Sequence, residues 1–260
     1  MQGVAYKRRP RQIAAAVAMS VILATPVVAG TLSIDIDAGA GISLKPAWEG
    51  ASKSEIGAYP IFRLHALNLF NLLDIGGPES GLSIAPSVGY ISARKASSDV
   101  VLHGVGDVDQ AFEAGARVSY RWQNARALFE LRHGFGGYEG WVGMVGADAI
   151  FQPGTNLTIE VGPRLGFADD GFMQTYFGIT AAQSAGSGYQ IHEAQSGLKN
   201  VGAEAEARYQ LSTRWALVGK IEYQRLIADA ADSPLVLAGS RDQFTIGLGL
   251  STRLQWSSER

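Results

Sequence analysis

Residues 112–122 alternate between apolar and polar side chains with a period of two. The apolar positions are Phe112, Ala114, Ala116, Val118, Tyr120 and Trp122, and Glu113, Arg117, Ser119 and Arg121 lie between them. Successive side chains of a β-strand point to opposite faces, so this segment has one apolar face and one face with three formal charges. The pattern predicts a strand that contacts lipid on one side and water on the other.

The same alternation recurs along most of the chain. It is found in residues 32–44, 82–90, 127–135, 156–167, 203–211, 215–223 and 243–256. These segments are long enough for the tilted strands of about 9 to 11 residues that cross a bilayer. Because bacterial barrels have an even number of strands, we predict an all-β fold, an antiparallel transmembrane β-barrel of about 12 strands, with 10 and 14 as the alternatives.

Turn signals divide the strands. Short connections are predicted at residues 123–124, 152–154, 169–171 and 212–213, and longer ones near residues 45–57, 94–110, 181–199 and 229–242. Residues 67–73 fit either a strand or a connection. Since that choice reverses the side of several loops, the sequence leaves the loop topology open.

A secreted β-sandwich is the soluble alternative, because its strands also alternate. Sandwich strands are shorter, about 5 to 6 residues, and place their aromatic residues centrally. Here the aromatic residues gather near the ends of segments: Tyr120, Trp122, Trp141, Trp215, Tyr223 and Trp256. Interfacial girdles of a membrane barrel have this arrangement, which favours the barrel.

The N-terminus resembles a secretory signal peptide. Lys7, Arg8, Arg9 and Arg11 precede an apolar run from residue 13 to 24, and small residues end at Ala29. The run is shorter than the roughly 20 residues that a membrane-spanning anchor needs, so we predict cleavage after Ala29. The predicted organisation is a signal peptide at residues 1–29 and a barrel domain at residues 30–260.

Composition agrees with an exported barrel. The full chain of 260 residues has 32 Gly, 9 Pro, no Cys and a net charge of −2. Without its first 29 residues it keeps 18 Lys and Arg against 24 Asp and Glu, a net charge of −6. This acidic balance argues against nucleic-acid binding.

The polar phase of the predicted strands is rich in charges of both signs. It contains Arg117, Arg121, Glu160, Arg164, Glu204, Glu206, Arg208, Lys220, Glu222 and Arg253. In a small barrel such side chains either pair across the lumen and close it, or line a narrow pore. Pairing is the preferred interpretation, and the mixed signs argue against strong ion selectivity.

The sequence offers little catalytic chemistry. His65, His103, His133 and His192 are dispersed, without the spacing of a metal pair, and no cofactor motif is found. Ser184, Ser187 and His192 lie in one predicted loop and raise the hypothesis of a nucleophile with its base. A small-residue loop shaped by glycines is the preferred interpretation, so we expect no enzyme, no metal site and no cofactor.

Two blocks of sequence resemble the MltA-interacting protein (MipA/OmpV) family of Gram-negative outer-membrane proteins. The first block contains Tyr176, Phe177, Gly178, Gln183, Ser184, Ser187, Gly188 and Gly197, and the second contains Asp229, Ala230, Ser233 and Pro234. Residues 60–62 and 104–115 match more weakly. The chain departs from the usual aromatic end of outer-membrane barrels, because Trp256 is followed by four further residues.

The resemblance implies an outer-membrane scaffold or adaptor. It suggests a lytic transglycosylase and a murein synthase as protein partners, with outer-membrane lipid around the barrel. A narrow porin-like channel is the alternative function, and an outer-membrane lipid-modifying enzyme is a third.

Overall fold

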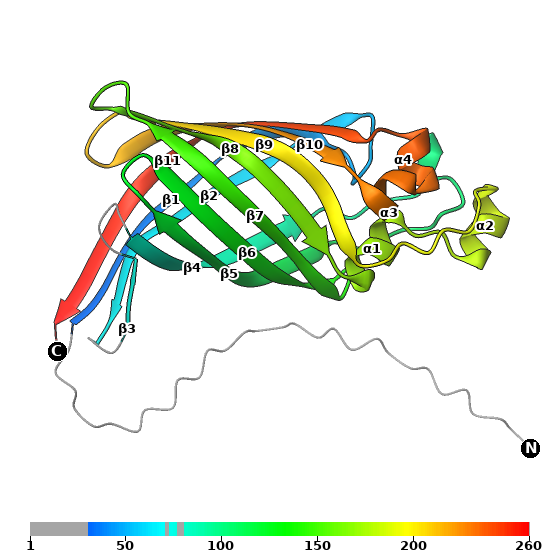
Figure 1. Cartoon of the computed structure of the whole chain (residues 1–260), viewed down its shortest axis with the longest axis horizontal. Coiled ribbons are helices and arrows are strands. Elements are labelled where there is room, and N and C mark those ends of the chain that lie inside the picture. The colour runs from blue at the N-terminus through cyan, green and yellow to red at the C-terminus, as the bar shows by residue number, and fades with distance from the viewer. Residues whose placement is uncertain (1–30, 71–72, 77–80, 260) are drawn as a thin grey trace, which may run out of the picture.

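The computed structural model describes residues 31–70, 73–76 and 81–259, and the predicted signal peptide lies outside these residues. One antiparallel sheet in the order β3-β2-β1-β11-β10-β9-β8-β7-β6-β5-β4 curls into a nearly closed barrel (Figure 1). The strands are β1 (Thr31–Pro46), β2 (Ser54–Leu69), β3 (Leu73–Gly76), β4 (Gly81–Ile91), β5 (Ala111–Arg121), β6 (Ala125–Gly136), β7 (Gly140–Phe151), β8 (Leu157–Ala168), β9 (Gly197–Gln210), β10 (Trp215–Leu226) and β11 (Asp242–Glu259). The helices are the short 3-10 helix η1 (Val100–Leu102), α1 (Asp170–Phe177), α2 (Ala181–Ser187), α3 (Ala228–Asp232) and α4 (Pro234–Ala238).

The prediction of an antiparallel all-β barrel is confirmed. Ten long strands form the wall of the described barrel, one of the two alternative counts, in place of the preferred twelve; β3 adds only four residues beside β2. The first and last strands pair along almost their whole length, from Thr31 with Glu259 to Leu44 with Ile246. This pairing joins the two ends of the chain within the wall.

The structure differs from several of the predicted connections. Residues 54–57 belong to β2, which continues to Leu69 and so contains part of the ambiguous segment. Residues 169–171 do not form a short turn: Asp169 Oδ1 accepts a hydrogen bond from the Phe172 N–H (3.1 Å) and starts α1. An Asp-Asp-Gly run fits both a turn and a helix N-terminus. Here the apolar residues that follow are buried on one side of a helix, so the run starts α1. Residues 197–199 and Asp242 likewise belong to strands β9 and β11.

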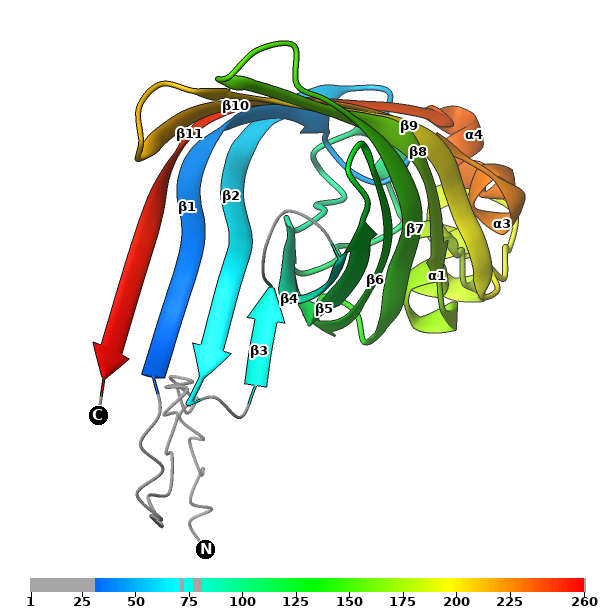
Figure 2. The same ribbon diagram turned by 60° about the vertical axis from the view of Figure 1, so that its left-hand side comes forward.

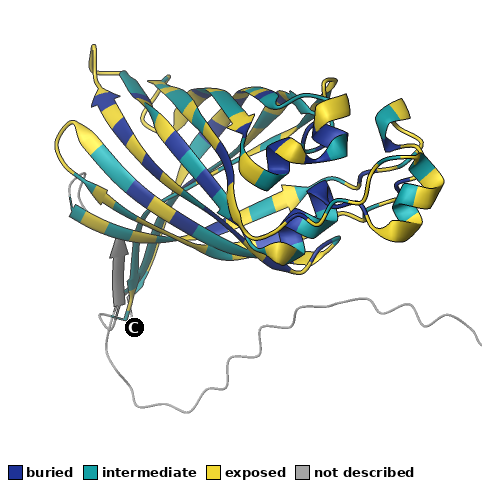
Figure 3. Cartoon of the chain, turned by 45° about the vertical axis from the view of Figure 1, so that its right-hand side comes forward, coloured by how far each residue is buried: buried dark blue, intermediate teal, exposed yellow. Residues whose placement is uncertain are grey.

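The alternation of side chains matches the two faces of the wall, as the banded strands of Figure 3 show. In β11 the exposed side chains are Phe244, Ile246, Leu248, Leu250, Leu254 and Trp256. The other phase faces the lumen, where Ser251 is buried and accepts a hydrogen bond from Arg208 of β9 (3.1 Å). An apolar exterior around a polar interior is the inverse of a soluble protein and is typical of a membrane barrel.

The two ends of the barrel differ (Figure 1). At one end, here the turn end, residues 122–124, 152–156 and 211–214 connect strands tightly, and β1 begins and β11 ends there. At the other, the loop end, residues 47–53, 92–110, 169–196 and 227–241 form long connections with all the helices. No helix among the described residues has the length and apolar character to cross a bilayer. In outer-membrane barrels short turns face the periplasm and long loops face outward.

Candidate functional site: a plugged and charge-bridged lumen

The loop end is filled by a plug, defined here as α1 to α4 with the connections 169–196 and 227–241. Its buried apolar cluster consists of Ala111, Tyr138, Val142, Ala168, Phe172, Met173, Tyr176, Phe177, Ala194, Leu226, Ala230 and Val236. Phe172 and Tyr176 pack edge-to-face against Tyr138 at centroid distances of 5.0 and 5.6 Å. Because the cluster joins helix residues to the ends of four strands, the plug is packed into the barrel wall.

Arg94 anchors the carboxyl end of α1. Its side chain is almost fully buried, and its two terminal nitrogens donate hydrogen bonds to the carbonyls of Tyr176 (3.0 Å) and Thr175 (3.3 Å). Burial lowers the pKa of Arg94 to about 10. A cation at this position satisfies carbonyls that a helix leaves without partners.

The two family-like blocks meet inside the plug. Ser233 Oγ donates a hydrogen bond to the Phe177 carbonyl (2.7 Å), and the Asp229 carboxylate accepts one from the Gln195 N–H (3.0 Å). Ala230 is fully buried, and Pro234 opens α4. Segments about fifty residues apart in sequence therefore form one structural unit.

The remaining residues of the first block shape α2 and its exit. Gln183 completes a capping box with Thr180, and its side-chain amide also donates to the Val105 carbonyl (2.7 Å). Gly188 ends the helix in the left-handed conformation, with φ of 80°. Gly178 ends α1, and Gly197, with φ of 155°, starts β9.

The serine and histidine of this block are not arranged as a nucleophile with a base. Ser184 Oγ donates to the Tyr189 carbonyl (2.6 Å) and Ser187 Oγ to the Gln183 carbonyl (2.6 Å). His192 Nε2 lies 3.0 Å from the Asp229 carbonyl oxygen. All three side chains contact backbone groups that hold the loop together. Among the described residues, no cluster of three or more His, Asp or Glu side chains has the arrangement of a metal site.

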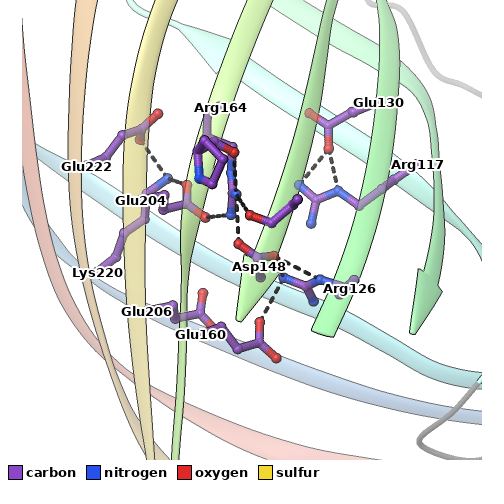
Figure 4. A network of polar contacts seen from close by, with 12 residues as sticks. Arg117, Arg126, Glu130, Asp148, Glu160, Arg164, Glu204, Glu206, Lys220 and Glu222 are labelled. Atoms are coloured by element: carbon purple, nitrogen blue, oxygen red, sulfur yellow. Dashed lines mark hydrogen bonds and ion pairs between the residues drawn. The ribbon is translucent and has the colours of Figure 1, made fainter. Parts of the chain in front are cut away.

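Below the plug, a network of ion pairs crosses the lumen (Figure 4). Arg164 is almost fully buried and contacts Asp148 at 2.7 Å and Glu204 at 2.9 Å. Lys220 continues the network to Glu204 (3.0 Å) and Glu222 (2.8 Å). These contacts join β7, β8, β9 and β10 along one wall.

Arg63 joins the opposite wall to this network. It extends from β2 and contacts Glu206 of β9 at 2.6 Å and Glu160 of β8 at 3.5 Å. In the sheet order, β1, β11 and β10 separate β2 from β9. The Arg63 side chain therefore bridges the lumen instead of pairing with a neighbouring strand.

The sequence-selected lumen charges enter three groups of contacts. Glu160, Arg164, Glu204, Glu206, Lys220 and Glu222 belong to the central network, with Arg121 at its edge, 3.7 Å from Glu160. Arg117 pairs with Glu130 at 2.6 Å, nearer the loop end. Arg208 pairs with Asp37 at 2.8 Å and Arg253 with Asp35 at 2.6 Å, nearer the turn end.

Sequence analysis missed several members of these networks. Arg126, Glu130 and Arg132 alternate along β6 and could have been selected by the phase of residues 127–135. Asp148 lies in β7, and Arg63 in β2, two strands that were not predicted as alternating segments. Arg63 was missed because β2 begins inside a predicted loop and its Gly-Ala-Tyr-Pro run weakens the strand signal.

Water-sized space remains on both sides of the central network. A cavity of about 250 Å³ between plug and network is lined by residues including Arg132, Lys199 and Glu222. A larger cavity of about 490 Å³, here called the vestibule, lies on the turn-end side, with Arg63, Arg121 and Arg208 in its lining. The network separates the two cavities.

These features define a class of protein: a membrane β-barrel whose loop end holds a packed plug and whose lumen is bridged by ion pairs. The chain belongs to the family of the MltA-interacting protein MipA, whose family model matches residues 38–254. This membership, together with the apolar exterior, places the barrel in the outer membrane.

Solved structures give only distant likenesses, and no curated protein matches the chain. The outer membrane protein OprG from Pseudomonas aeruginosa is 10% identical, with coverage of 86% of this chain and 98% of that chain at a TM-score of 0.32. Neisserial surface protein A is 10% identical, with coverage of 87% and 99% at a TM-score of 0.28. The CymD monoaromatic hydrocarbon channel is 7% identical, with coverage of 89% and 88% at a TM-score of 0.33. TM-scores this low support no conclusion about this chain.

Proposed function

We propose that this protein is an outer-membrane scaffold that brings together a lytic transglycosylase and a murein synthase at the periplasmic face, and that it is not an enzyme. The bridging of the lumen by Arg63 is the observation that most favours a scaffold over a channel. The name of the family, MltA-interacting protein, supports the choice of a lytic transglycosylase as one partner.

A strand edge at the turn end offers a contact for such a partner. β10 pairs with β11 only as far as Thr252, whereas β1 pairs with β11 as far as Glu259. Among the described strands, none therefore pairs with the other edge of residues 254–259 of β11, and Figure 2 shows β11, β1 and β2 projecting together. Unpaired strand edges bind extended segments of other proteins by strand addition.

The direction of the edge N–H groups can be assigned. The Arg253 N–H donates to the Arg214 carbonyl (2.8 Å), on the β10 side. Since N–H groups alternate between the two sides of a strand, those of Gln255 and Ser257 point to the same unpaired side. Replacement of Ser257 by Pro removes one donor from this edge and leaves the pairing with β1 intact.

Affinity capture from envelope extracts tests the scaffold. We expect the full mature chain to retain a lytic transglycosylase, S257P to retain at least about fivefold less because an edge hydrogen bond is lost, and the control S257A to behave as wild type. Failure of the wild type to capture any murein hydrolase or synthase would refute the scaffold. Equal capture by S257P and S257A would exclude this edge as the contact.

The alternative function is a narrow porin-like channel, which the water-sized cavities above and below the network favour. Planar bilayers separate the two functions, because a channel gives single-channel conductance and the closed scaffold gives none.

We also propose that the protein is exported and that residues 1–29 are removed. The intact mass of the purified barrel should then correspond to a chain that begins at Gly30.

A further inference from the structure

The barrel wall has a seam between β2 and β4. β3 pairs with β2 only from Ala66 to Leu69, so residues 54–65 of β2 have β1 as their one pairing partner among the described strands. β4 pairs with β5 and lies at the opposite end of the sheet order. Figure 2 shows the two strands apart above β3.

Each strand that borders the seam contains a proline, which removes one backbone N–H donor from that strand. Pro60 lies midway along β2 and Pro86 midway along β4, and both belong to the exposed phase. Proline has no N–H group, so within sheets it occupies edges, with its nitrogen away from the paired neighbour. The nitrogens of Pro60 and Pro86 therefore face the seam, and each border lacks a donor there. This pair of prolines disfavours closure of the wall by direct pairing of β2 and β4.

The vestibule extends to this seam at the turn end. Its lining includes Arg63 and Leu64 from β2 and Leu82 and Ser83 from β4. Five arginines and one carboxylate line the cavity: Arg63, Arg121, Arg126, Arg208, Arg253 and Asp37. Asp148 and Glu160, which pair with some of these arginines, are buried behind them with side-chain exposures of 0% and 5%. Glu206 and Asp35 pair with Arg63 and Arg253 at 2.6 Å each, and Asp37 pairs with Arg208 at 2.8 Å. The cationic capacity left for a ligand therefore lies mainly at Arg121, whose nearest carboxylate is 3.7 Å away.

Arg121 is the arginine of this lining with capacity for an anion. Among the described residues it has one ion pair, with Glu160 Oε1 at 3.7 Å, which is too long for a hydrogen bond, and its buried Nε has no hydrogen-bond partner there. It lies directly opposite Arg126 in the β5–β6 pairing. Like charges in this position repel each other. Glu160 contacts Arg126 at 2.7 Å but Arg121 only at 3.7 Å, so the charge of Arg121 is the less fully offset of the two and a second anion would stabilise it.

Along the barrel axis, Arg121 lies at the level expected for the lipid headgroups. Its chain neighbours Tyr120 and Trp122 are 44% and 52% exposed, as in an aromatic girdle at a membrane interface. Leu82 pairs with Tyr120, and Ile84 lies two residues deeper along β4, beside the seam. Both are exposed and apolar, at 64% and 44%. A cationic pocket at headgroup level thus adjoins an apolar path at acyl-chain level.

We propose that the vestibule and seam form a binding site for an anionic amphiphile of the inner leaflet. Its headgroup contacts Arg121 and Arg126, and its acyl chain leaves between β2 and β4 over Leu82 and Ile84. The seam-facing N–H groups of β2 and β4 donate to the ester carbonyls, which satisfies backbone groups that would otherwise face hydrocarbon. This site is independent of the scaffold function.

Native mass spectrometry of the mature barrel in neutral detergent tests the site. We expect phosphatidylglycerol to bind in preference to phosphatidylcholine, and R121Q to weaken the binding of phosphatidylglycerol by about tenfold or more through loss of charge-assisted hydrogen bonds. R117Q is the matched control: Arg117 lies on the same strand and faces the lumen, but it pairs with Glu130 (2.6 Å) and is not part of the vestibule lining. R117Q should bind the lipid as wild type does.

Two competitors distinguish the sources of the anion. Glycerol phosphate has the headgroup charge without the chain, and a murein tripeptide has carboxylates without a chain. Weak binding of both supports the amphiphile. If glycerol phosphate binds as strongly as phosphatidylglycerol, the site is a simple phosphate site. If the tripeptide binds more strongly than phosphatidylglycerol and its binding depends on Arg121, the site is a murein site. Either result overturns the proposal. Equal affinities of wild type and R121Q for phosphatidylglycerol would also overturn it.

Discussion

Arg63 and Glu160 show how single charged residues close this lumen. Glu160 has a side chain that is 5% exposed and contacts Arg63 at 3.5 Å, Arg121 at 3.7 Å and Arg126 at 2.7 Å. A carboxylate among three guanidinium groups offsets their mutual repulsion; Asp148 and Glu206 also contact Arg126 and Arg63, but only Glu160 contacts all three. Removal of one partner from a buried ion pair leaves uncompensated charge, which costs much more than the pair itself contributes.

We therefore expect E160Q to lower the free energy of unfolding by about 3–5 kcal/mol. The control is E55Q, since the Lys45–Glu55 pair is similar in length (3.7 Å) but has side chains that are 28% and 40% exposed; its loss should cost less than about 1 kcal/mol. Denaturant unfolding in a fixed detergent measures both. Equal losses in the two variants would contradict a central role for Glu160.

At the scale of elements, the plug is stabilised by aromatic packing and by two buried tyrosines, Tyr138 and Tyr176, whose hydroxyl groups are protonated. The Tyr138 O–H donates to Glu113 Oε1 at 2.8 Å. Burial, and then the Glu113 carboxylate, raise the pKa of Tyr138 well above its usual range. Burial, and then the carboxylates of Glu49 and Glu113, do the same for the pKa of Tyr176. Both groups favour the folded plug only while they carry their protons.

The sign of the pH dependence follows. Because both folded-state pKa values are raised, their contribution is complete below the ordinary tyrosine pKa of about 10 and is lost as the pH rises above it. We expect the melting temperature of the barrel to fall above about pH 10, and Y138F to reduce the slope of that fall. A slope that is unchanged in the double variant Y138F/Y176F would show that these phenols do not control the plug.

The strands and the plug differ in how far sequence could predict them. Residues 112–121 and 243–256 lie in β5 and β11 as expected, because a two-sided wall imposes period two on every strand, and Trp122 follows directly after β5. The helix α1 was not predicted, because its eight residues have no long periodic pattern and its burial comes from strand ends that are distant in sequence. β2 was not predicted as a strand, and only its last residues fall in the ambiguous segment 67–73, because it begins inside a predicted loop and Pro60 interrupts its signal.

At the scale of the whole molecule, two barriers lie in series along the lumen. The plug packs apolar side chains into the loop end, and Arg63 bridges the middle. In the proposed closed scaffold, ions pass only when both barriers are open.

The wild type and the single variants R63A and F172D should therefore give silent bilayers, and only R63A/F172D should conduct. The control pair R117A/F172D should remain silent, because Arg117 pairs with Glu130 of the adjacent strand and does not bridge the lumen. Single-channel recording measures this. Discrete openings in the wild type would favour the channel, and silence of R63A/F172D would show that the barrier lies elsewhere.

The sequence by itself determined the antiparallel barrel, its lipid-facing phase, its family resemblance and the residues of the two blocks, because these depend on local periodicity and on short motifs. The selected lumen charges also came from phase alone. Only the tertiary structure decided that Arg63 reaches Glu206 across the lumen, that Ser233 meets Phe177 in a plug, and that β2 and β4 leave a seam. These features depend on the curvature of the sheet and on contacts between strands that are distant in the chain, which an alternating pattern does not encode.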